Sequence, residues 1–251
     1  MSALADPVDE ARRILSAAGE AGLPIRAIGG VGVALIAPTI ARLEPRRTYH
    51  DIDLVAPAGT AAITRLMTAL GYEPARQFNT LNGSERLLFH DAGGRRVDVF
   101  IDTLRMCHEL PFRHRLSSEA WPWTLPAADL LLSKLQIVEA TDRDTQDLLA
   151  LLADHELVES DGGGIELDRI REVCGNDWGW WRTVDDNLER LIATWSEPAS
   201  ESATAHARPT ARDRARVLLS VLAACPKSMG WRVRAAVGTR IRWYDLPEEV
   251  R

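Results

Sequence analysis

The stretch that most constrains the fold runs from Ile25 to Val55. It begins with a short apolar segment that ends in Gly29-Gly30, a pattern that predicts a strand breaking into a tight turn. The apolar run at 31–43 predicts a helix that starts at this turn. Glycines let backbone N–H groups approach an anion at a helix N-terminus, where the helix dipole also favours negative charge. The turn is therefore a candidate phosphate site.

A pair of aspartates closes the same stretch. In the sequence DIDLV, apolar residues alternate with Asp51 and Asp53, so a strand places both carboxylates on one face. Two neighbouring carboxylates are suited to bind Mg²⁺ rather than to pack in a core. We therefore predict a metal site on this strand.

A third acidic residue lies in a similar pattern further along the chain. In residues 95–102, RRVDVFID, apolar residues alternate with Asp98 and Asp102, as in a strand with one buried face. The Gly-rich segment DAGG before it predicts a β-hairpin with the strand that starts at Arg86. Asp98 is thus a third candidate ligand.

This order of motifs resembles the nucleotidyltransferase superfamily of DNA polymerase β type, over about residues 20–155. The resemblance implies that Asp51 and Asp53 hold Mg²⁺, and that Asp98 binds the ion that activates the acceptor hydroxyl. Two ions would then act on a nucleoside triphosphate such as ATP. Many members have Gly-Ser where this chain has Gly29-Gly30, so only backbone donors remain for the phosphates.

From Pro126 the chain reads as two helices that resemble the helical segment of AbiEii-type nucleotidyltransferases. Their lysine and R-D-x-x-D-like element match Lys134, Arg143, Asp144 and Asp147. The resemblance implies that Lys134 reaches the triphosphate as a mobile point charge and that Asp144 belongs to the nucleotide site. The alternative is a surface lysine opposite acidic residues.

Length and composition set the domain organisation that we expect. With 251 residues, 46% hydrophobic and 26% charged, the chain can bury one good core and a smaller second one. The fold class that we predict is α/β: a nucleotidyltransferase-like N-terminal domain with a mixed sheet and flanking helices, followed by a C-terminal helical domain. The expected parts are 1–125 (α/β core), 126–156 (helices completing the active site) and 157–251 (helical domain with a flexible loop near 197–209).

The cysteines and the N-terminus bear on the cell compartment. Cys107, Cys174 and Cys225 are far apart and lack metal-ligand spacing, which favours thiols in a reducing environment. No segment has the pattern of a signal peptide or a membrane span. We therefore expect a cytoplasmic protein without a membrane partner.

The C-terminal part combines tryptophans with basic residues. The tryptophans are interpreted as a helical core, with base stacking as the alternative. The net charge is −6, yet the segment 231–243 carries four arginines: Arg232, Arg234, Arg240 and Arg242. This asymmetry indicates an RNA or another phosphate-rich partner. The alternative is that they pair with the acidic residues Asp185, Asp186 and Glu189.

The predicted function is Mg²⁺-dependent transfer of a nucleoside monophosphate from an NTP to a hydroxyl acceptor. The resemblance to AbiEii- and MenT-like toxins implies an RNA acceptor such as a tRNA 3′ end, and a partner antitoxin. The sequence His50-Asp51-Ile52-Asp53 also resembles a motif of lincosamide and aminoglycoside nucleotidyltransferases. This second resemblance implies a small hydroxylated acceptor. A third hypothesis is a non-catalytic nucleotide- or RNA-binding module, against which clustered carboxylates argue because they repel without a cation.

Overall fold

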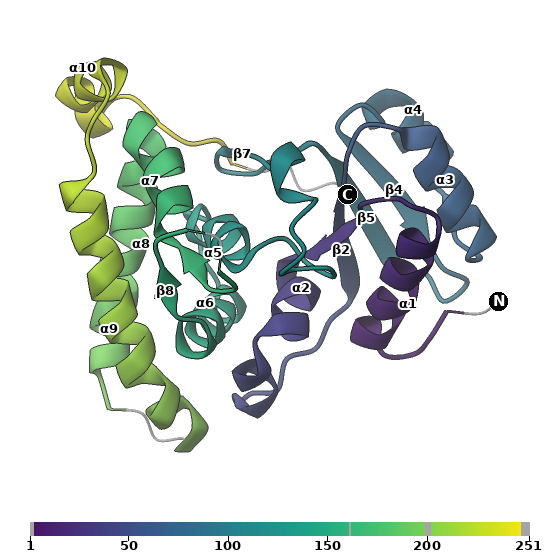
Figure 1. The fold of residues 1–251 in the computed structure, drawn as a ribbon, viewed down its shortest axis with the longest axis horizontal. Helices are drawn as coiled ribbons and strands as arrows, with labels where there is room; N and C mark the ends of the chain where they lie inside the picture. The colour runs from purple at the N-terminus through teal and green to yellow at the C-terminus, as the bar shows by residue number, and fades with distance from the viewer. Residues whose placement is uncertain (1–2, 161, 199–201, 247–251) are drawn as a thin grey trace. The chain divides into compact units, whose positions relative to one another are not determined.

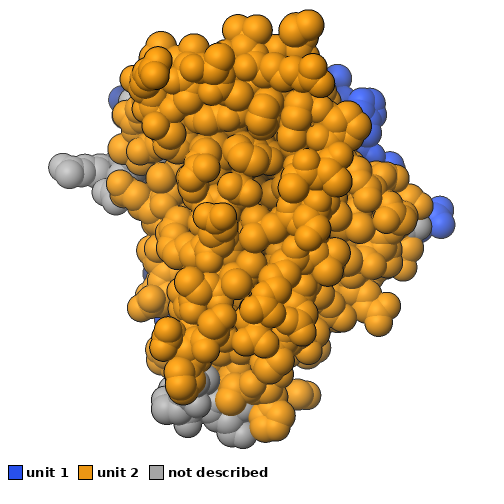
Figure 2. Space-filling model, turned by 90° about the vertical axis from the view of Figure 1, so that its left-hand side faces the viewer, with its two compact units in different colours: residues 1–36, 48–104, 111–126 blue, residues 37–47, 105–110, 127–251 orange. Residues whose placement is uncertain are grey.

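The computed structural model describes residues 3–160, 162–198 and 202–246. The chain divides into two compact units (Figure 2). Unit 1 comprises residues 1–36, 48–104 and 111–126, and unit 2 comprises residues 37–47, 105–110 and 127–251. Two short stretches of the expected N-terminal domain, 37–47 and 105–110, thus belong to unit 2. The segment that we expected to be separate, 126–156, lies almost entirely in the same unit as the C-terminal helices.

Unit 1 is built on a five-stranded mixed sheet with the order β1-β2-β5-β4-β3 (Figure 1). Strands β2 and β5 are parallel, and the other neighbours are antiparallel. The strands are β1 Arg26–Ile28, β2 Asp51–Ala56, β3 Glu73–Pro74, β4 Arg86–His90 and β5 Arg96–Ile101. The helices are α1 Pro7–Glu20, α2 Gly29–Ile36, α3 Thr60–Ala69 and α4 Arg76–Asn82. The expected α/β class with a mixed sheet is confirmed.

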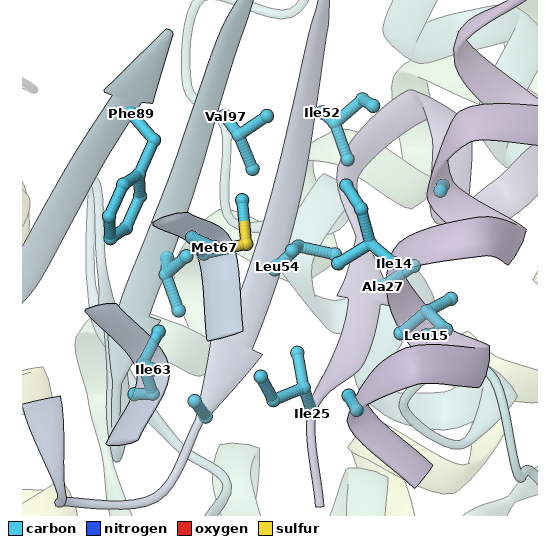
Figure 3. Close-up of a cluster of buried hydrophobic side chains, with 14 of the residues drawn as sticks. Ile14, Leu15, Ile25, Ala27, Ile52, Leu54, Ile63, Met67, Phe89 and Val97 are labelled. Atoms are coloured by element: carbon cyan, nitrogen blue, oxygen red, sulfur yellow. The ribbon is translucent and has the colours of Figure 1, made fainter. Parts of the chain in front are cut away.

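The core of unit 1 lies on one face of this sheet. Ile52 and Leu54 of β2 and Val97 of β5 project into a cluster with side chains of α1 and α3 (Figure 3). Full burial of each such side chain contributes roughly 1.5–3 kcal/mol. Because side chains alternate along a strand, burying this set places the intervening residues of β2 and β5 on the opposite face.

The helix that follows the Gly-Gly turn is shorter than predicted. We expected a helix over 31–43, but α2 runs from Gly29 to Ile36 and a 3₁₀ helix, η1, follows at Pro38–Arg42. Pro38 cannot donate a backbone hydrogen bond and disfavours helical backbone at the preceding Ala37, which has φ −114° and ψ 87°. Proline therefore ends α2 eight residues after it begins.

Short strands and a further helix occupy the remaining stretches of the sequence. After α3 the chain pairs with β4 only at Glu73–Pro74 and then turns into α4. The other short elements are β6 Thr103–Arg105, β7 Glu109–Pro111, η2 Arg113–Arg115, β8 Leu157–Val158 and β9 Ile165–Glu166.

Unit 2 consists mainly of helices. They are α5 Ala127–Leu135, α6 Asp142–Asp154, α7 Leu167–Asn176, α8 Trp178–Ser196, α9 Ser202–Ala224, α10 Met229–Val237 and η3 Gly238–Arg240. Trp178, Trp180 and Trp195 are buried, which confirms the interpretation of these tryptophans as core. Within the described ranges, no helix is both long and apolar enough to span a bilayer.

The flexible loop expected near 197–209 is wrong for much of its length. Helix α9 begins at Ser202 and includes Pro209, while residues 199–201 lie outside the described residues. Alanine is the strongest helix former, and Ala207 in this stretch is buried. The stretch has few large apolar residues because alanines make up much of it, and alanines are compatible with a helix.

Candidate active site

The three candidate carboxylates share one face of the unit 1 sheet. In the parallel pairing of β2 with β5, Asp53 lies opposite Asp98 and Asp51 lies opposite Arg96. Asp51 and Asp53 are two residues apart on one strand, so their side chains point the same way. The face is the one opposite the α1 and α3 cluster. Asp51 is exposed, Asp53 is half-buried, and Asp98 is 1% exposed.

The Gly-Gly turn lies directly against this acidic face. Strand β1 pairs with β2 so that Ile28 is opposite Asp53, and α2 begins at the next residue, Gly29. Gly29 has φ +64°, and a Cβ there would clash with Oδ2 of Asp53. Glycine is required both by the backbone conformation and by the close approach of the carboxylate. Gly30 follows as the second residue of α2.

Two arginines on the same face hold Asp98, and the sequence-based prediction missed them. Oδ1 of Asp98 accepts from Arg86, at 2.8 Å from Nε, and lies 2.7 Å from its Nη2. Oδ2 lies 3.2 Å from Nη2 of Arg96. Arg96 stands two residues before Asp98 on β5, a spacing that places both on one face and was visible in the sequence. The contribution of Arg86 depends on the β4–β5 register.

These contacts limit which residues fit a metal ion. Mg²⁺ is commonly held by one or two carboxylates, with water and substrate phosphates as its other ligands. Asp51 and Asp53 fit that pattern, and they are less buried than Asp98, which accepts from two guanidinium groups. In the part of the chain that the structure describes, no group of three or more His, Cys, Asp or Glu side chains is arranged to hold a metal.

Lys134 belongs to unit 2 and is tied into a buried ion network. Its Nζ lies 2.9 Å from Oδ1 of Asp144 and 2.9 Å from Oδ2 of Asp147. Asp147 also pairs with Arg47, at 2.9 Å. The Lys134 side chain is 12% exposed, so it is not the surface lysine of the alternative interpretation, and its contact with a triphosphate stays a prediction. Burial lowers the pKa of Lys134, but the two aspartates outweigh it and the net shift is upward.

Asp144 has a structural role within α6. Its Oδ2 accepts from the backbone N–H of Thr141 at 3.0 Å, and the Thr141 side chain accepts from the Asp144 backbone, which forms a capping box. Burial raises and Lys134 lowers the pKa of Asp144, with a net downward shift. The R-D-x-x-D-like element therefore joins Lys134 to the start of α6.

The C-terminal arginines differ from one another. Arg234 donates to the carbonyls of Gly238 and Ile241, both at 2.7 Å, and its guanidinium lies 4.5 Å from the Trp178 ring centroid. Arg232 and Arg240 are exposed. The expected basic track of four residues therefore does not hold for Arg234, which closes the end of α10.

The acidic residues that we considered as partners of the C-terminal arginines include Asp185 and Asp186, which lie close to Arg182. Asp185 and Asp186 both pair with Arg182 on their own helix, α8. Burial and the neighbouring Glu189 raise the pKa of Asp185.

Taken together, unit 1 is an α/β unit with a mixed sheet, one face of which carries aspartates beside a glycine turn at a helix start. No protein-family model matches the sequence, and no curated protein matches it. Among solved structures, the chain is similar to JHP933 from Helicobacter pylori, with 11% identity and a TM-score of 0.41. That alignment covers 93% of this chain and 99% of the other.

Proposed function

We propose that this protein is a Mg²⁺-dependent nucleotidyltransferase that moves a nucleoside monophosphate from an NTP to a hydroxyl acceptor. One observation carries the proposal. Asp53 and Asp98 are register partners on adjacent parallel strands, and Gly29 at the start of α2 packs against Asp53. Asp51 lies on the same face. This arrangement supports the proposal, because carboxylates can hold a cation and backbone N–H groups at a helix start can donate to phosphate.

In the proposed reaction, the acceptor oxygen forms a bond to the α-phosphorus. The bond from that phosphorus to the bridging oxygen breaks, pyrophosphate leaves, and the hydroxyl proton passes to solvent. A bound Mg²⁺ supplies charge neutralisation for the phosphates and lowers the pKa of a coordinated hydroxyl. Asp51 and Asp53 are the residues that would hold it, while the backbone N–H groups at Gly29 and Gly30 would donate to phosphate oxygens.

RNA is the acceptor class that we propose. Arg232 and Arg240 present exposed positive charge at the end of a chain with net charge −6. Phosphate backbones attract such isolated basic surfaces through counterion release. An RNA-modifying toxin held by a partner antitoxin is the biological setting that this proposal implies.

A second candidate is a non-catalytic nucleotide-binding module. It is favoured by the guanidinium groups on Asp98, because they neutralise a carboxylate that catalysis by three acidic residues would need. Repulsion between clustered carboxylates was the argument against such a module. The two guanidinium groups weaken that argument, because they offset the negative charge in place of a metal cation.

Calorimetric titration with each NTP tests the proposal against this alternative. We expect binding to require Mg²⁺ and to be weakened at least tenfold in Asp53→Asn, because one carboxylate ligand is lost. Glu73→Gln, a substitution of an exposed acidic residue in β3, serves as the matched control. Equal affinity with and without Mg²⁺ would favour the non-catalytic module.

A further inference from the structure

We propose that Arg86 and Arg96 withdraw Asp98 from the set of metal ligands, so that this site takes a single divalent cation on Asp51 and Asp53. The inference rests on the proposed function and changes its expected metal content from two ions to one. Arg96 then supplies, as a fixed charge on the protein, the second positive group beside the nucleotide phosphates.

The first support is the pairing of Asp98 with two guanidinium groups. Its Oδ1 accepts from Arg86 at 2.8 Å, and its Oδ2 lies 3.2 Å from Nη2 of Arg96. Guanidinium groups stay protonated in proteins, so two positive charges remain beside this carboxylate. A cation on Asp98 would also lie against two positive charges. Both arginines therefore oppose the binding of a cation at Asp98.

The second support is that Arg86 is fixed in place. Its guanidinium carbon lies 5.0 Å from the ring centroid of Phe100 and 5.8 Å from that of Phe78. Planar guanidinium groups stack on aromatic rings while they pair with a carboxylate. Arg86 is therefore held from two sides, and Asp98 is the partner to which it points.

The third support is the location of Arg96. It lies opposite Asp51 in the β2–β5 pairing, and its side chain is 36% exposed. One guanidinium can thus contact Asp98 and still face solvent on the acidic side of the sheet. A charge at that place can donate to a phosphate oxygen while Asp51 and Asp53 hold the cation.

Electron paramagnetic resonance of Mn²⁺ counts the ions directly. We expect one Mn²⁺ per wild-type chain at saturation, and one in Asp98→Asn, because Asp98 is not a ligand. Asp53→Asn should bind none. With a non-hydrolysable α,β-methylene NTP analogue, the wild-type spectrum should lack the coupling that two ions about 3.5–4 Å apart produce.

Substitution of the arginines gives a complementary result. Arg86→Gln/Arg96→Gln should expose Asp98 and raise the count to two ions. Should that variant not fold, Arg96→Gln alone should keep one ion and weaken binding of the NTP analogue roughly tenfold, since a charge-assisted hydrogen bond is lost. Arg96→Lys should restore part of that loss.

The outcomes separate this inference from the proposed function. Two ions in the wild type, a coupled Mn²⁺ spectrum, or a fall from two ions to one in Asp98→Asn would overturn the single-cation site and leave the transferase proposal standing. No Mn²⁺ binding by the wild type, or equal binding by Asp53→Asn, would contradict the transferase proposal itself. Unchanged nucleotide affinity in Arg96→Gln would remove the role given to Arg96.

Discussion

Gly29 occupies the most restrictive backbone position of the candidate site. Its φ is +64°, and a Cβ at this position would meet the Asp53 carboxylate. Gly22 has a similar φ of +68°, but a Cβ there would meet nothing within 4 Å. An alanine at either position would strain the backbone, but only an alanine at position 29 would also contact the site. Comparing the two substitutions therefore distinguishes the effect of strain from the effect of contact.

We predict that Gly29→Ala abolishes Mg²⁺-dependent NTP binding, whereas Gly22→Ala preserves it. Both should lose about 1–2 kcal/mol of stability from the left-handed backbone. Calorimetry and denaturant unfolding on the two variants measure both effects. Normal NTP binding by Gly29→Ala would show that the turn does not form part of a nucleotide site.

Lys134 takes part in an ion network that the sequence-based prediction did not include. Because its partners Asp144 and Asp147 are themselves shielded from solvent, Lys134→Met leaves buried carboxylates with one cation fewer. We predict a loss of roughly 3–5 kcal/mol in the free energy of unfolding. Denaturant unfolding of Lys134→Met/Asp144→Asn should show a smaller loss than the single changes add up to. An unchanged free energy of unfolding in Lys134→Met would contradict a structural role and favour the hypothesis that Lys134 is a mobile charge for the triphosphate.

His108 supplies a pH-dependent contribution to stability. Its Nε2 lies 2.8 Å from Oγ1 of Thr183, and burial lowers its pKa although Asp177 and Asp245 oppose this. As pH falls below about 6.5, the unfolded chain binds a proton that the folded chain still resists. Stability conferred by the neutral ring is therefore present above pH 6.5 and lost as pH falls through the folded pKa.

We predict that His108→Gln reduces the acid-side fall in Tm between pH 7.5 and 5.5. The exposed His114 provides the control, because His114→Gln should keep the wild-type profile. Differential scanning calorimetry at a series of pH values measures the slopes. Identical slopes for wild type and His108→Gln would contradict the assignment to His108.

At the scale of elements, strand alternation was the most reliable predictor. A period of two residues is set by backbone geometry, so the pattern around Asp51 and Asp98 predicted β2, β5 and which side chains share a face. Helix extent was less predictable, since the same low apolar content is compatible with a loop and with the alanine-rich start of α9.

Contacts across elements were the part that sequence alone did not determine. The pairing of Arg86 with Asp98 depends on where the β4–β5 turn sets the register. The burial of Lys134 depends on packing of α5 and η1 against α6, which no local pattern specifies. Both pairings were therefore missed, although the strands and helices that carry them were expected.

The C-terminal element gives a test of the RNA proposal. Arg232 and Arg240 are exposed, whereas Arg234 donates to backbone carbonyls. We predict that Arg232→Gln/Arg240→Gln lowers the salt slope of RNA binding by about one unit per lost phosphate contact. Arg234→Gln should instead lower thermal stability. Fluorescence anisotropy over a salt series measures the slope, and RNA binding without salt dependence would favour a small-molecule acceptor.

At the scale of the whole molecule, the chain passes from unit 1 into unit 2 and back, so neither unit is one continuous segment of the sequence. Residues 37–47 belong to unit 2, where Leu43 is buried and Thr39 bonds to Asp154 through its backbone N–H at 2.8 Å. Cutting the chain after Pro126 would strip this stretch of its partners. Measurements on the site of unit 1 therefore belong on the full chain.

Transfer of label from an NTP tests the central claim most directly. The full chain is incubated with total RNA, Mg²⁺ and each NTP labelled with ³²P at either the α- or the γ-phosphate. We predict that the α label enters RNA with at least one NTP, that the γ label does not, and that Asp53→Asn reduces incorporation at least a hundredfold. Incorporation of the γ label would indicate a kinase. Wild-type levels of α-label transfer by Asp53→Asn, or no transfer to RNA or to a panel of small hydroxylated acceptors, would contradict a nucleotidyltransferase built on Asp51 and Asp53.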